Sequence, residues 1–237
     1  MKSLNNVIAI DGPAASGKTT AASLLARRLR FLNINTGAMY RALSLKAIRA
    51  GIPATNVEEI ERLLEATDIS LGRKADGSTS VVLDGEDVSQ QIKDDEVAQA
   101  ASVISRLPAV RDYMVSRQRE IAGGGWAIAE GRDTTTVVFP NARYKFFIDA
   151  SLDTRAQRRH EELVAQGISI PMEQVKEDLR RRDAADRKRK LSPLRKARDA
   201  IRLDSTDLTP EQVVDQILKH LAPHLKAKGD HPPSEKG

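Results

Sequence analysis

The sequence predicts an α/β fold, in which a parallel β-sheet is flanked by helices. Three observations favour this fold class. Strand-like apolar segments alternate with segments whose apolar residues recur at helical spacing. A glycine-rich turn joins the first predicted strand to the first predicted helix, as in parallel sheets whose strands are buried on both faces. The length of 237 residues suits one substantial domain with an elaboration better than two independent domains.

The first half of the chain combines a buried strand, three helices and a β-rich segment. Residues 7–11 form a short apolar run that ends at the glycine-rich turn, which is typical of a buried parallel strand. Apolar residues at helical spacing predict helices at 18–32, 37–50 and 57–66. Short strands joined by turn-type sequences are predicted at 69–71, 80–83 and 86–88. Because these short strands lie between helices, we expect them to form an insertion in the main fold.

The second half of the chain supplies more helices and the remaining strands of the main sheet. Strands are predicted at 126–130, 144–149 and 201–204, so the main sheet is expected to have four strands. Helices are predicted at 94–105, 108–121, 153–166, 171–189 and 210–225. We therefore expect a single domain over residues 1–225. Residues 226–237 are rich in Lys, Gly and Pro and are predicted to be a disordered tail.

The composition excludes several classes of protein. Cysteine is absent, which excludes a disulfide framework and a cysteine-ligated metal, and the four histidines disfavour a histidine-built zinc site. No apolar run approaches the roughly 20 residues that span a bilayer, and the N-terminus lacks a signal-peptide pattern. We therefore expect a cytoplasmic protein without membrane contact. Aromatic residues make up 3% of the chain, which disfavours stacking on single-stranded nucleic acid.

The formal net charge of +5 comes from one basic segment. Residues 151–202 hold 15 Lys and Arg against 9 Asp and Glu, so the rest of the chain is close to neutral. Such a segment can be a solvated helix face, a nucleic-acid contact or an element that handles phosphate groups. Composition alone leaves these three alternatives open.

A phosphate-binding pattern lies between the first predicted strand and the first predicted helix, where residues 12–19 match G-x-x-x-x-G-K-[ST]. Its glycines let backbone N–H groups converge on phosphate oxygens, and the helix N-terminus adds positive charge there. Lys18 would neutralise the β- and γ-phosphates, and the Thr19 hydroxyl is placed to meet Mg²⁺. The pattern predicts a nucleoside triphosphate site formed by Gly12, Pro13, Ala14, Ala15, Ser16, Gly17, Lys18, Thr19 and Thr20. ATPases, GTPases and small-molecule kinases share it, although the N-K-x-D motif of GTPases is absent.

Further motifs stand in order along residues 7–220. They are Asn35-Thr36-Gly37-Ala38-Met39-Tyr40-Arg41, Leu83-Asp84-Gly85-Glu86-Asp87-Val88-Ser89, Glu130-Gly131-Arg132-Asp133, Arg182-Asp183-x-x-Asp186-x-x-Arg189, Ser192-Pro193-Leu194 and Leu203-Asp204-Ser205-Thr206. Together these motifs resemble those of the bacterial cytidylate kinases. The resemblance implies a P-loop NTPase-type parallel sheet with an inserted α/β monophosphate-binding domain at about 37–107 and a helical lid at about 153–190.

The resemblance also assigns an acceptor site. The residues that it implies for CMP are Thr36, Arg41, Ser102, Arg111, Arg132, Asp133, Arg182, Asp186 and Arg189. Arg41 and Arg132 would hold the acceptor phosphate, because planar arginines neutralise a phosphate dianion through several donors. Ser102 and Arg111 match the positions that read the cytosine edge, and Asp133 supports that pocket.

The basic segment contains two sets of arginines that match the family. Arg182, Asp186 and Arg189 are spaced i, i+4 and i+7, so one helix face would present a cation, an anion and a cation. By resemblance the first two contact the ribose. A surface ion-pair ladder is the alternative. Three arginines on the preceding helix resemble a lid that covers ATP, with a solvated face as the alternative: Arg155, Arg158 and Arg159.

The implied reaction is phosphoryl transfer from ATP to CMP or dCMP in pyrimidine nucleotide metabolism, with Mg²⁺ as cofactor. The attacking phosphate oxygen is already ionised, so catalysis needs alignment and charge neutralisation rather than a general base. The residues expected to provide these are Lys18, Arg132, Arg182 and Arg189. Two alternatives stay open, namely a P-loop kinase for UMP, AMP or a shikimate-like acceptor, and a nucleic-acid-binding ATPase. We expect a monomer that binds neither nucleic acid nor membrane.

Three positions depart from the family pattern. Asn35 stands where Asp is usual, Thr135 where Gly is usual, and Thr19 where many members lack a hydroxyl that reaches the metal. A threonine at 135 would be strained if the backbone there needs a positive φ. The hydroxyl of Thr19 favours closer contact with Mg²⁺. None of the three removes a residue that the chemistry needs.

Overall fold

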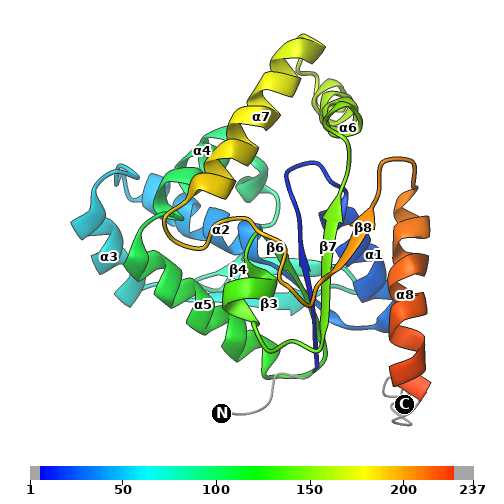
Figure 1. Ribbon diagram of the computed structural model, residues 1–237. Coiled ribbons are helices and arrows are strands. Elements are labelled where there is room, and N and C mark those ends of the chain that lie inside the picture. Colours follow the sequence, from blue (N-terminus) through cyan, green and yellow to red (C-terminus); the bar gives the residue numbers. More distant parts are fainter. Residues whose placement is uncertain (1–5, 227–237) are drawn as a thin grey trace.

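The main sheet confirms the predicted α/β class. The structure is a computed structural model and describes residues 6–226, within which the main sheet has five strands, all parallel, in the order β2-β6-β1-β7-β8 (Figure 1). These strands are β1 (Val7–Asp11), β2 (Leu32–Asn35), β6 (Ala127–Gly131), β7 (Tyr144–Asp149) and β8 (Ile201–Asp204). The central position of β1 places the glycine-rich loop that follows it in the middle of the carboxyl edge of the sheet, where ligands bind in open α/β folds.

Strand β2 corrects the prediction of a helix over residues 18–32 and of four main strands. Helix α1 (Lys18–Leu29) ends three residues earlier, because Arg30 adopts a left-handed conformation with φ 55°. The N–H of Phe31 then donates to the carbonyl of Ala26 at 2.9 Å, which closes the helix end. The chain continues directly into β2, which pairs with β6 and forms the edge of the sheet.

Helices cover both faces of the main sheet, and the alternating side chains of β1 show how. Val7 and Ala9 lie in an apolar cluster with Met39 of α2 (Thr36–Arg49) and with Met114 of α5 (Pro108–Ala122). Successive residues of a strand face opposite sides, and the remaining two apolar residues of β1 accordingly pack on the other face with α1 and α8 (Pro210–Lys226). Every residue of β1 is therefore buried.

A small antiparallel sheet forms beside the main one, as predicted from the turn-type sequences. Its strands, in the order β3-β4-β5, are β3 (Ile69–Arg73), β4 (Thr79–Leu83) and β5 (Glu86–Asp87). The neighbouring helices are α3 (Val57–Glu65), the 3-10 turn η1 (Gln91–Lys93) and α4 (Asp95–Ile104). Its apolar residues join the same cluster as Val7, and the N–H of Asn33 donates to the hydroxyl of Thr79 at 3.3 Å. The small sheet is thus packed onto the main one, while its role as a monophosphate-binding insertion at about 37–107 stays a prediction.

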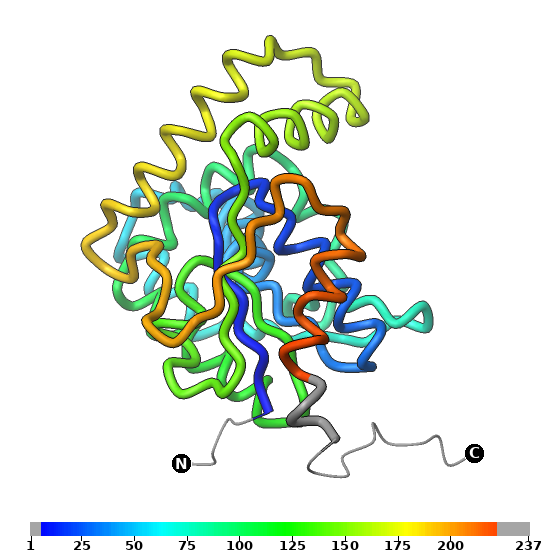
Figure 2. The backbone as a smooth tube through the Cα atoms, turned by 45° about the vertical axis from the view of Figure 1, so that its right-hand side comes forward, coloured from blue at the N-terminus to red at the C-terminus, as the bar shows by residue number. Residues whose placement is uncertain are grey.

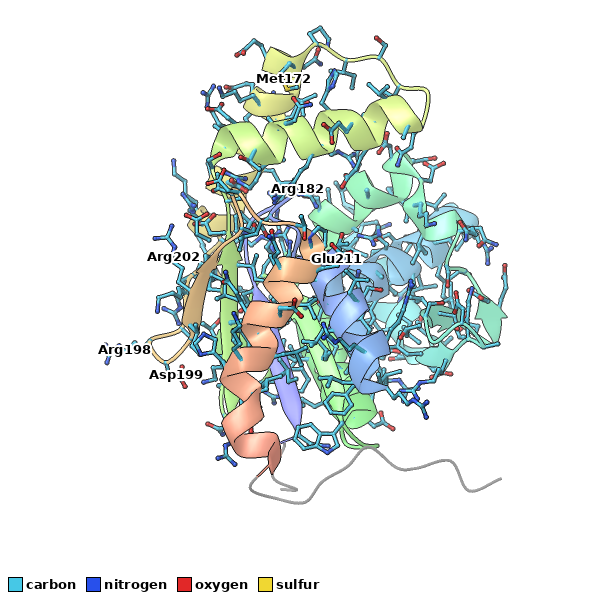
Figure 3. All side chains as sticks on the ribbon, turned by 90° about the vertical axis from the view of Figure 1, so that its right-hand side faces the viewer. Met172, Arg182, Arg198, Asp199, Arg202 and Glu211 are labelled. Carbon is cyan, nitrogen blue, oxygen red and sulfur yellow. The ribbon has the colours of Figure 1, made fainter. Side chains whose placement is uncertain are left out.

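Two successive helices that cross each other, α6 (Leu152–Ala165) and α7 (Met172–Lys188), form an arm above the carboxyl edge of the main sheet (Figure 2). The arm has its own apolar cluster, in which Ala156, Leu163 and Leu179 pack with Ala14 of the glycine-rich loop. Figure 3 shows Arg182 of α7 on the side of the arm that faces the core, and Met172, the first residue of α7, farther out. The two helices lie where the helical lid was predicted, at about 153–190, and their role as a lid stays a prediction.

The C-terminal helix α8 ends at Lys226, one residue into the predicted tail. The remaining residues of that tail, 227–237, lie outside the described part of the chain. In the segment from residue 6 to residue 226, no helix has the length and apolar character that crossing a membrane requires.

Candidate active site

The glycine-rich loop has a geometry that requires glycine at its first position. A Cβ atom added to Gly12 would lie 2.0 Å from the carbonyl oxygen of Ile148, so any side chain there would collide with backbone. Ala15 and Gly17 adopt left-handed φ angles of 57° and 82°, and such alternation turns successive N–H groups toward one point. Helix α1 begins at Lys18, which adds a helix N-terminus to the same place. The loop is therefore built to bind an anion.

Lys18 is the buried cation of this loop. Its residue is 4% exposed, and its ammonium group donates to the carbonyl oxygen of Pro13 at 2.9 Å. Burial and, after it, the positive charge of Arg132 lower the pKa of Lys18 to about 7, while the carboxylate of Glu130 opposes the shift. A phosphate group at the loop would stabilise the charged form of Lys18 and reverse this effect.

This pKa predicts a pH dependence of ATP binding. In the free protein Lys18 loses its proton as pH rises through about 7, so binding to the charged form must take up a proton above that pH. We expect the dissociation constant for MgATP to increase about tenfold between pH 6 and pH 8. Calorimetric titrations in buffers of different ionisation enthalpy would measure both the affinity and the proton uptake. A Lys18→Met variant with the same pH slope as the wild type would contradict the assignment.

Glu130 belongs to the Glu130-Gly131-Arg132-Asp133 motif, but the sequence analysis assigned it no role in the site. It lies at the end of β6, is 3% exposed, and accepts a hydrogen bond from the hydroxyl of Thr19 at 3.0 Å. Its backbone carbonyl accepts another from the hydroxyl of Thr36 at 2.9 Å. The signal that could have found it is positional: an acidic residue ends the strand adjacent to β1, at the edge where the phosphate loop lies.

One cleft of about 1140 Å³ lies between the arm, the phosphate loop and the small-sheet side of the molecule. It brings together most of the predicted site residues, namely Ala14, Ala15, Gly17, Lys18, Thr19, Thr20, Thr36, Arg41, Ser102, Arg111, Arg132, Asp133, Arg159, Arg182, Asp186 and Arg189. The predicted residues that do not line it are Gly12, Pro13, Ser16 and Arg155. The first three belong to the buried side of the loop.

Asp186 holds two arginines together in the cleft. It accepts from Nε of Arg132 at 2.8 Å and pairs with the guanidinium of Arg189 at 2.5 Å. The spacing argument placed Asp186 between Arg182 and Arg189, and only the second pairing occurs. Helix α7 ends at Lys188, so Arg189 has an extended backbone and reaches back to Asp186 from just beyond the helix.

Arg182 and Arg41 contribute positive charge without such pairing. Over residues 6–221 no carboxylate lies within ion-pair distance of either guanidinium. Arg182 retains access to water, yet the surrounding protein lowers its pKa to about 10, first by burial and then through the charge of Arg132. Burial also lowers the pKa of Arg41. Both groups stay charged at neutral pH and together make this part of the cleft strongly cationic.

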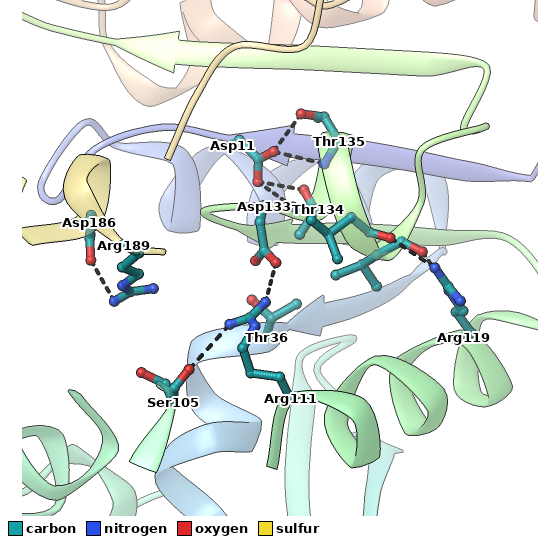
Figure 4. A network of polar contacts seen from close by, with 12 residues as sticks. Asp11, Thr36, Ser105, Arg111, Arg119, Asp133, Thr134, Thr135, Asp186 and Arg189 are labelled. Carbon is teal, nitrogen blue, oxygen red and sulfur yellow. Dashed lines mark hydrogen bonds and ion pairs between the residues drawn. The ribbon is translucent and has the colours of Figure 1, made fainter. Parts of the chain in front are cut away.

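A buried ion pair lies at the end of the cleft near the small sheet. Arg111 pairs with Asp133, both nearly inaccessible, and donates a longer hydrogen bond to the carbonyl of Ser105 at 3.4 Å (Figure 4). Its guanidinium carbon lies 6.0 Å from the ring centre of Tyr40. Burial raises the pKa of Asp133, while the charge of Arg111 lowers it. The exposed side chain of Ser102 lines the same end of the cleft.

The arginines of α6 divide into two groups, which corrects the prediction for Arg155. Arg155 is buried, pairs with Asp183 of α7 at 2.6 Å and donates to the carbonyl of Ala14 at 3.3 Å. It thus joins the base of the arm to the phosphate loop instead of facing the cleft. Arg158 and Arg159 do line the cleft, and Arg158 donates to the carbonyl of Ser205 at 2.6 Å.

Two of the departures from the family pattern have plain structural roles. The side-chain oxygen of Asn35 accepts the N–H of Ala38 at 2.8 Å and caps α2, for which an uncharged amide is sufficient. Thr135 is not among the residues with positive φ, so its branched side chain causes no strain. Its hydroxyl instead donates to Asp11 at 2.6 Å.

Comparisons with known proteins cover nearly the whole chain. The family model described as cytidylate kinase matches residues 8–222. A cytidylate kinase from Caldanaerobacter subterraneus is 45% identical over 228 residues, which cover 96% of this chain and 100% of the relative. A cytidylate kinase from a Geobacillus species is 44% identical, and the match covers 91% of this chain and 96% of the relative. One from Bacillus subtilis is 42% identical, and the match covers 90% of this chain and 94% of the relative.

Proposed function

The chain belongs to the cytidylate kinase family, and from this premise we propose that it transfers the γ-phosphoryl group of ATP to CMP or dCMP, forming ADP and CDP or dCDP. One observation carries the proposal: the phosphate loop and a cluster of arginines face the same cleft. Arg132 and Arg182 lie close enough to Lys18 to lower its pKa, so the two phosphate-binding groups are electrostatic neighbours. Such an arrangement suits two nucleotides whose phosphates must meet.

The donor nucleotide is assigned to the phosphate loop. The loop N–H groups and Lys18 would hold the β- and γ-phosphates of ATP. Arg159 of the arm lines the cleft on this side, and so does Arg158, whose contact with the carbonyl of Ser205 places it beside β8. Closure of the arm over ATP would exclude water and suppress its hydrolysis.

The acceptor nucleotide is assigned to the opposite side of the cleft. Arg41 and Arg132 would bind the CMP phosphate, and Asp186, which already holds Arg132, would accept a ribose hydroxyl. Arg111, held by Asp133, would face the cytosine edge. The attacking oxygen is an ionised phosphate oxygen, so these residues orient it and neutralise charge instead of removing a proton.

The family implies Mg²⁺, and the donor chemistry beside the loop fits this ion. The hydroxyl of Thr19 and the carboxylate of Glu130 lie 3.0 Å apart, and hard oxygen donors of this kind suit Mg²⁺. No group of three or more acidic or histidine side chains within the described residues forms a metal cage. A magnesium ion held by one or two protein oxygens, phosphates and water needs none. When bound, it would neutralise charge on the β- and γ-phosphates.

A coupled assay of ADP release tests the proposal across CMP, dCMP, UMP, AMP, GMP and shikimate. We expect kcat/KM for CMP or dCMP to exceed that for every other acceptor by at least about tenfold, since buried polar groups reject a base that leaves them unpaired. Equal turnover with AMP or UMP would contradict the assignment of CMP or dCMP as the acceptor but not the assignment as a kinase. Turnover with no acceptor at all would favour an ATPase.

The finer points of the proposal are a monomeric enzyme in the cytoplasm that binds neither nucleic acid nor membranes. The phosphate loop and the arginines assigned to the two nucleotides line one cleft of a single chain, which supports activity without a partner. Titration with a single-stranded polynucleotide at low and high salt tests the nucleic-acid alternative. We expect negligible binding, whereas an affinity that falls steeply with salt would support a polynucleotide contact along the arm.

A further inference from the structure

Asp11 is a buried carboxylate to which the proposed reaction assigns no part. It is the last residue of β1, directly before Gly12, and is fully inaccessible to water. Burial raises the pKa of Asp11, and hydrogen bonds from Thr135 and Thr134 oppose the shift. One carboxylate oxygen accepts the N–H and the hydroxyl of Thr134 at 2.8 and 2.7 Å. The other accepts the N–H and the hydroxyl of Thr135 at 2.8 and 2.6 Å (Figure 4).

These bonds cap a helical turn that lies elsewhere in the sequence. Residues Thr134–Val138 form a short π-helical turn, η2, whose first N–H groups have no partner inside the turn. The residue before a helix normally supplies that partner from its own side chain. Here that residue is Asp133, and its side chain makes no capping bond. Asp11 therefore does the capping in its place.

Because Asp11 caps the turn in place of Asp133, the carboxylate of Asp133 is available to the cleft. Asp133 is free of the helix end, and its carboxylate pairs with Arg111. Two of the interactions that Asp11 accepts begin at the residue next to Asp133, so the direction of the Asp133 side chain depends on how the turn is held. After burial and Arg111, the negative charge of Asp11 is the next influence on the pKa of Asp133, which indicates that the two carboxylates are close.

We propose that Asp11 is a positioning residue for acceptor recognition: by capping the η2 turn from the end of β1, it leaves Asp133 free to hold Arg111 toward the acceptor base. Asp11 also joins that turn to the strand that carries the phosphate loop, because it is the last residue of β1 and accepts the N–H groups of Thr134 and Thr135. The inference rests on the proposed function and names a residue that acts through Asp133 and Arg111, without contact with substrate.

Thr135 is the part of this device that departs from the family pattern. A glycine at this position would supply the N–H group alone, whereas Thr135 adds a hydroxyl that donates to Asp11 at 2.6 Å. The hydroxyl of its neighbour Thr136 is buried and has no hydrogen-bond partner among the described residues. The two threonines therefore form a matched pair, in which one hydroxyl supports Asp11 and the other does not.

The test compares Asp11→Asn, Thr135→Val and Thr136→Val by steady-state kinetics with CMP and ATP. In Asp11→Asn the side-chain NH₂ group faces the N–H and the hydroxyl of one threonine and cannot accept their hydrogen bonds. That helix end then lacks a partner, and we expect the Asp133 side chain to turn toward it. We expect KM for CMP to rise about tenfold, and the preference for CMP over UMP to fall about tenfold, with KM for ATP changed less than about threefold. Thr135→Val should change KM for CMP in the same direction by about threefold, and Thr136→Val should leave it unchanged.

The readouts separate positioning from folding. Partial unfolding lowers the amount of active enzyme, and thus the apparent kcat, but leaves both KM values and the CMP-to-UMP preference as they are. A Thr135→Ser variant keeps the hydroxyl and should behave like the wild type. An equal rise of both KM values in Asp11→Asn, or an unchanged KM for CMP, would overturn the inference. If the wild type prefers another acceptor, the proposed function fails, and the same comparison with that acceptor decides the role of Asp11.

Discussion

Replacing Lys18 with alanine is expected to lower kcat by a factor on the order of 10³, the largest effect of any single change in the cleft. The ammonium group of Lys18 lies in a buried position at the start of α1. A fixed charge in such a site stabilises the charge that develops on the transferring phosphoryl group far more than it would in bulk water. The loop backbone remains, so ATP should still bind, although more weakly.

The stability of this variant distinguishes lost chemistry from lost folding. Burial is the main reason why the pKa of Lys18 is lowered to about 7, which means that the charged side chain is disfavoured in the folded protein without its anion. We therefore expect Lys18→Ala to unfold at a thermal midpoint no lower than that of the wild type. Lys219→Ala, a change at an exposed position on α8, serves as the control with normal kcat. A loss of kcat below about tenfold would contradict the proposed role of Lys18.

The geometry that could be anticipated most fully from the sequence is that encoded by local segments of the chain. The phosphate loop is a contiguous motif whose glycines are needed where it folds, and Gly12 indeed has the carbonyl of Ile148 within 2.0 Å of where a Cβ would lie. The strands of the small sheet were recognisable because turn residues separate them. In both cases the information lies within a few residues of the structure that it determines.

The errors arose where packing between distant segments decides the outcome. No glycine or proline separates α1 from the strand at Leu32–Asn35. The helix ends because Arg30 adopts a left-handed conformation, which is usual for glycine and cannot be predicted from an arginine. Arg155 and Arg158 lie three residues apart on one helix and are chemically alike. Arg155 is drawn inward because Asp183 of α7 offers a buried partner, and the sequence contains no local sign of that pairing. Glu130 lies beside the phosphate loop because β6 pairs with β1, and that pairing joins segments far apart in the sequence.

Replacing Arg182 with alanine is expected to lower kcat/KM for CMP by about 10² to 10³. Arg182 projects from α7 beneath the arm, and among residues 6–221 it has no carboxylate partner, unlike Arg132 and Arg189, which Asp186 holds. Burial and the charge of Arg132 lower its pKa to about 10, so it is a charged group held among other cations. Anionic substrates would relieve this repulsion, and the relief is greatest when the phosphates of both nucleotides meet.

The measurement is kcat and KM for CMP in Arg182→Ala, Arg182→Lys and the neighbouring control Arg180→Ala. Arg180 is exposed, pairs with Glu177 at 3.3 Å on the same helix and does not line the cleft, so its loss should leave the kinetics unchanged. Arg182→Lys should recover part of the activity, because a lysine restores the charge without the planar set of donors. Since Arg182 lies among like charges, Arg182→Ala should not lower the thermal midpoint of unfolding. An unchanged kcat/KM for CMP would show that Arg182 belongs to the solvated surface of the arm and not to the acceptor site.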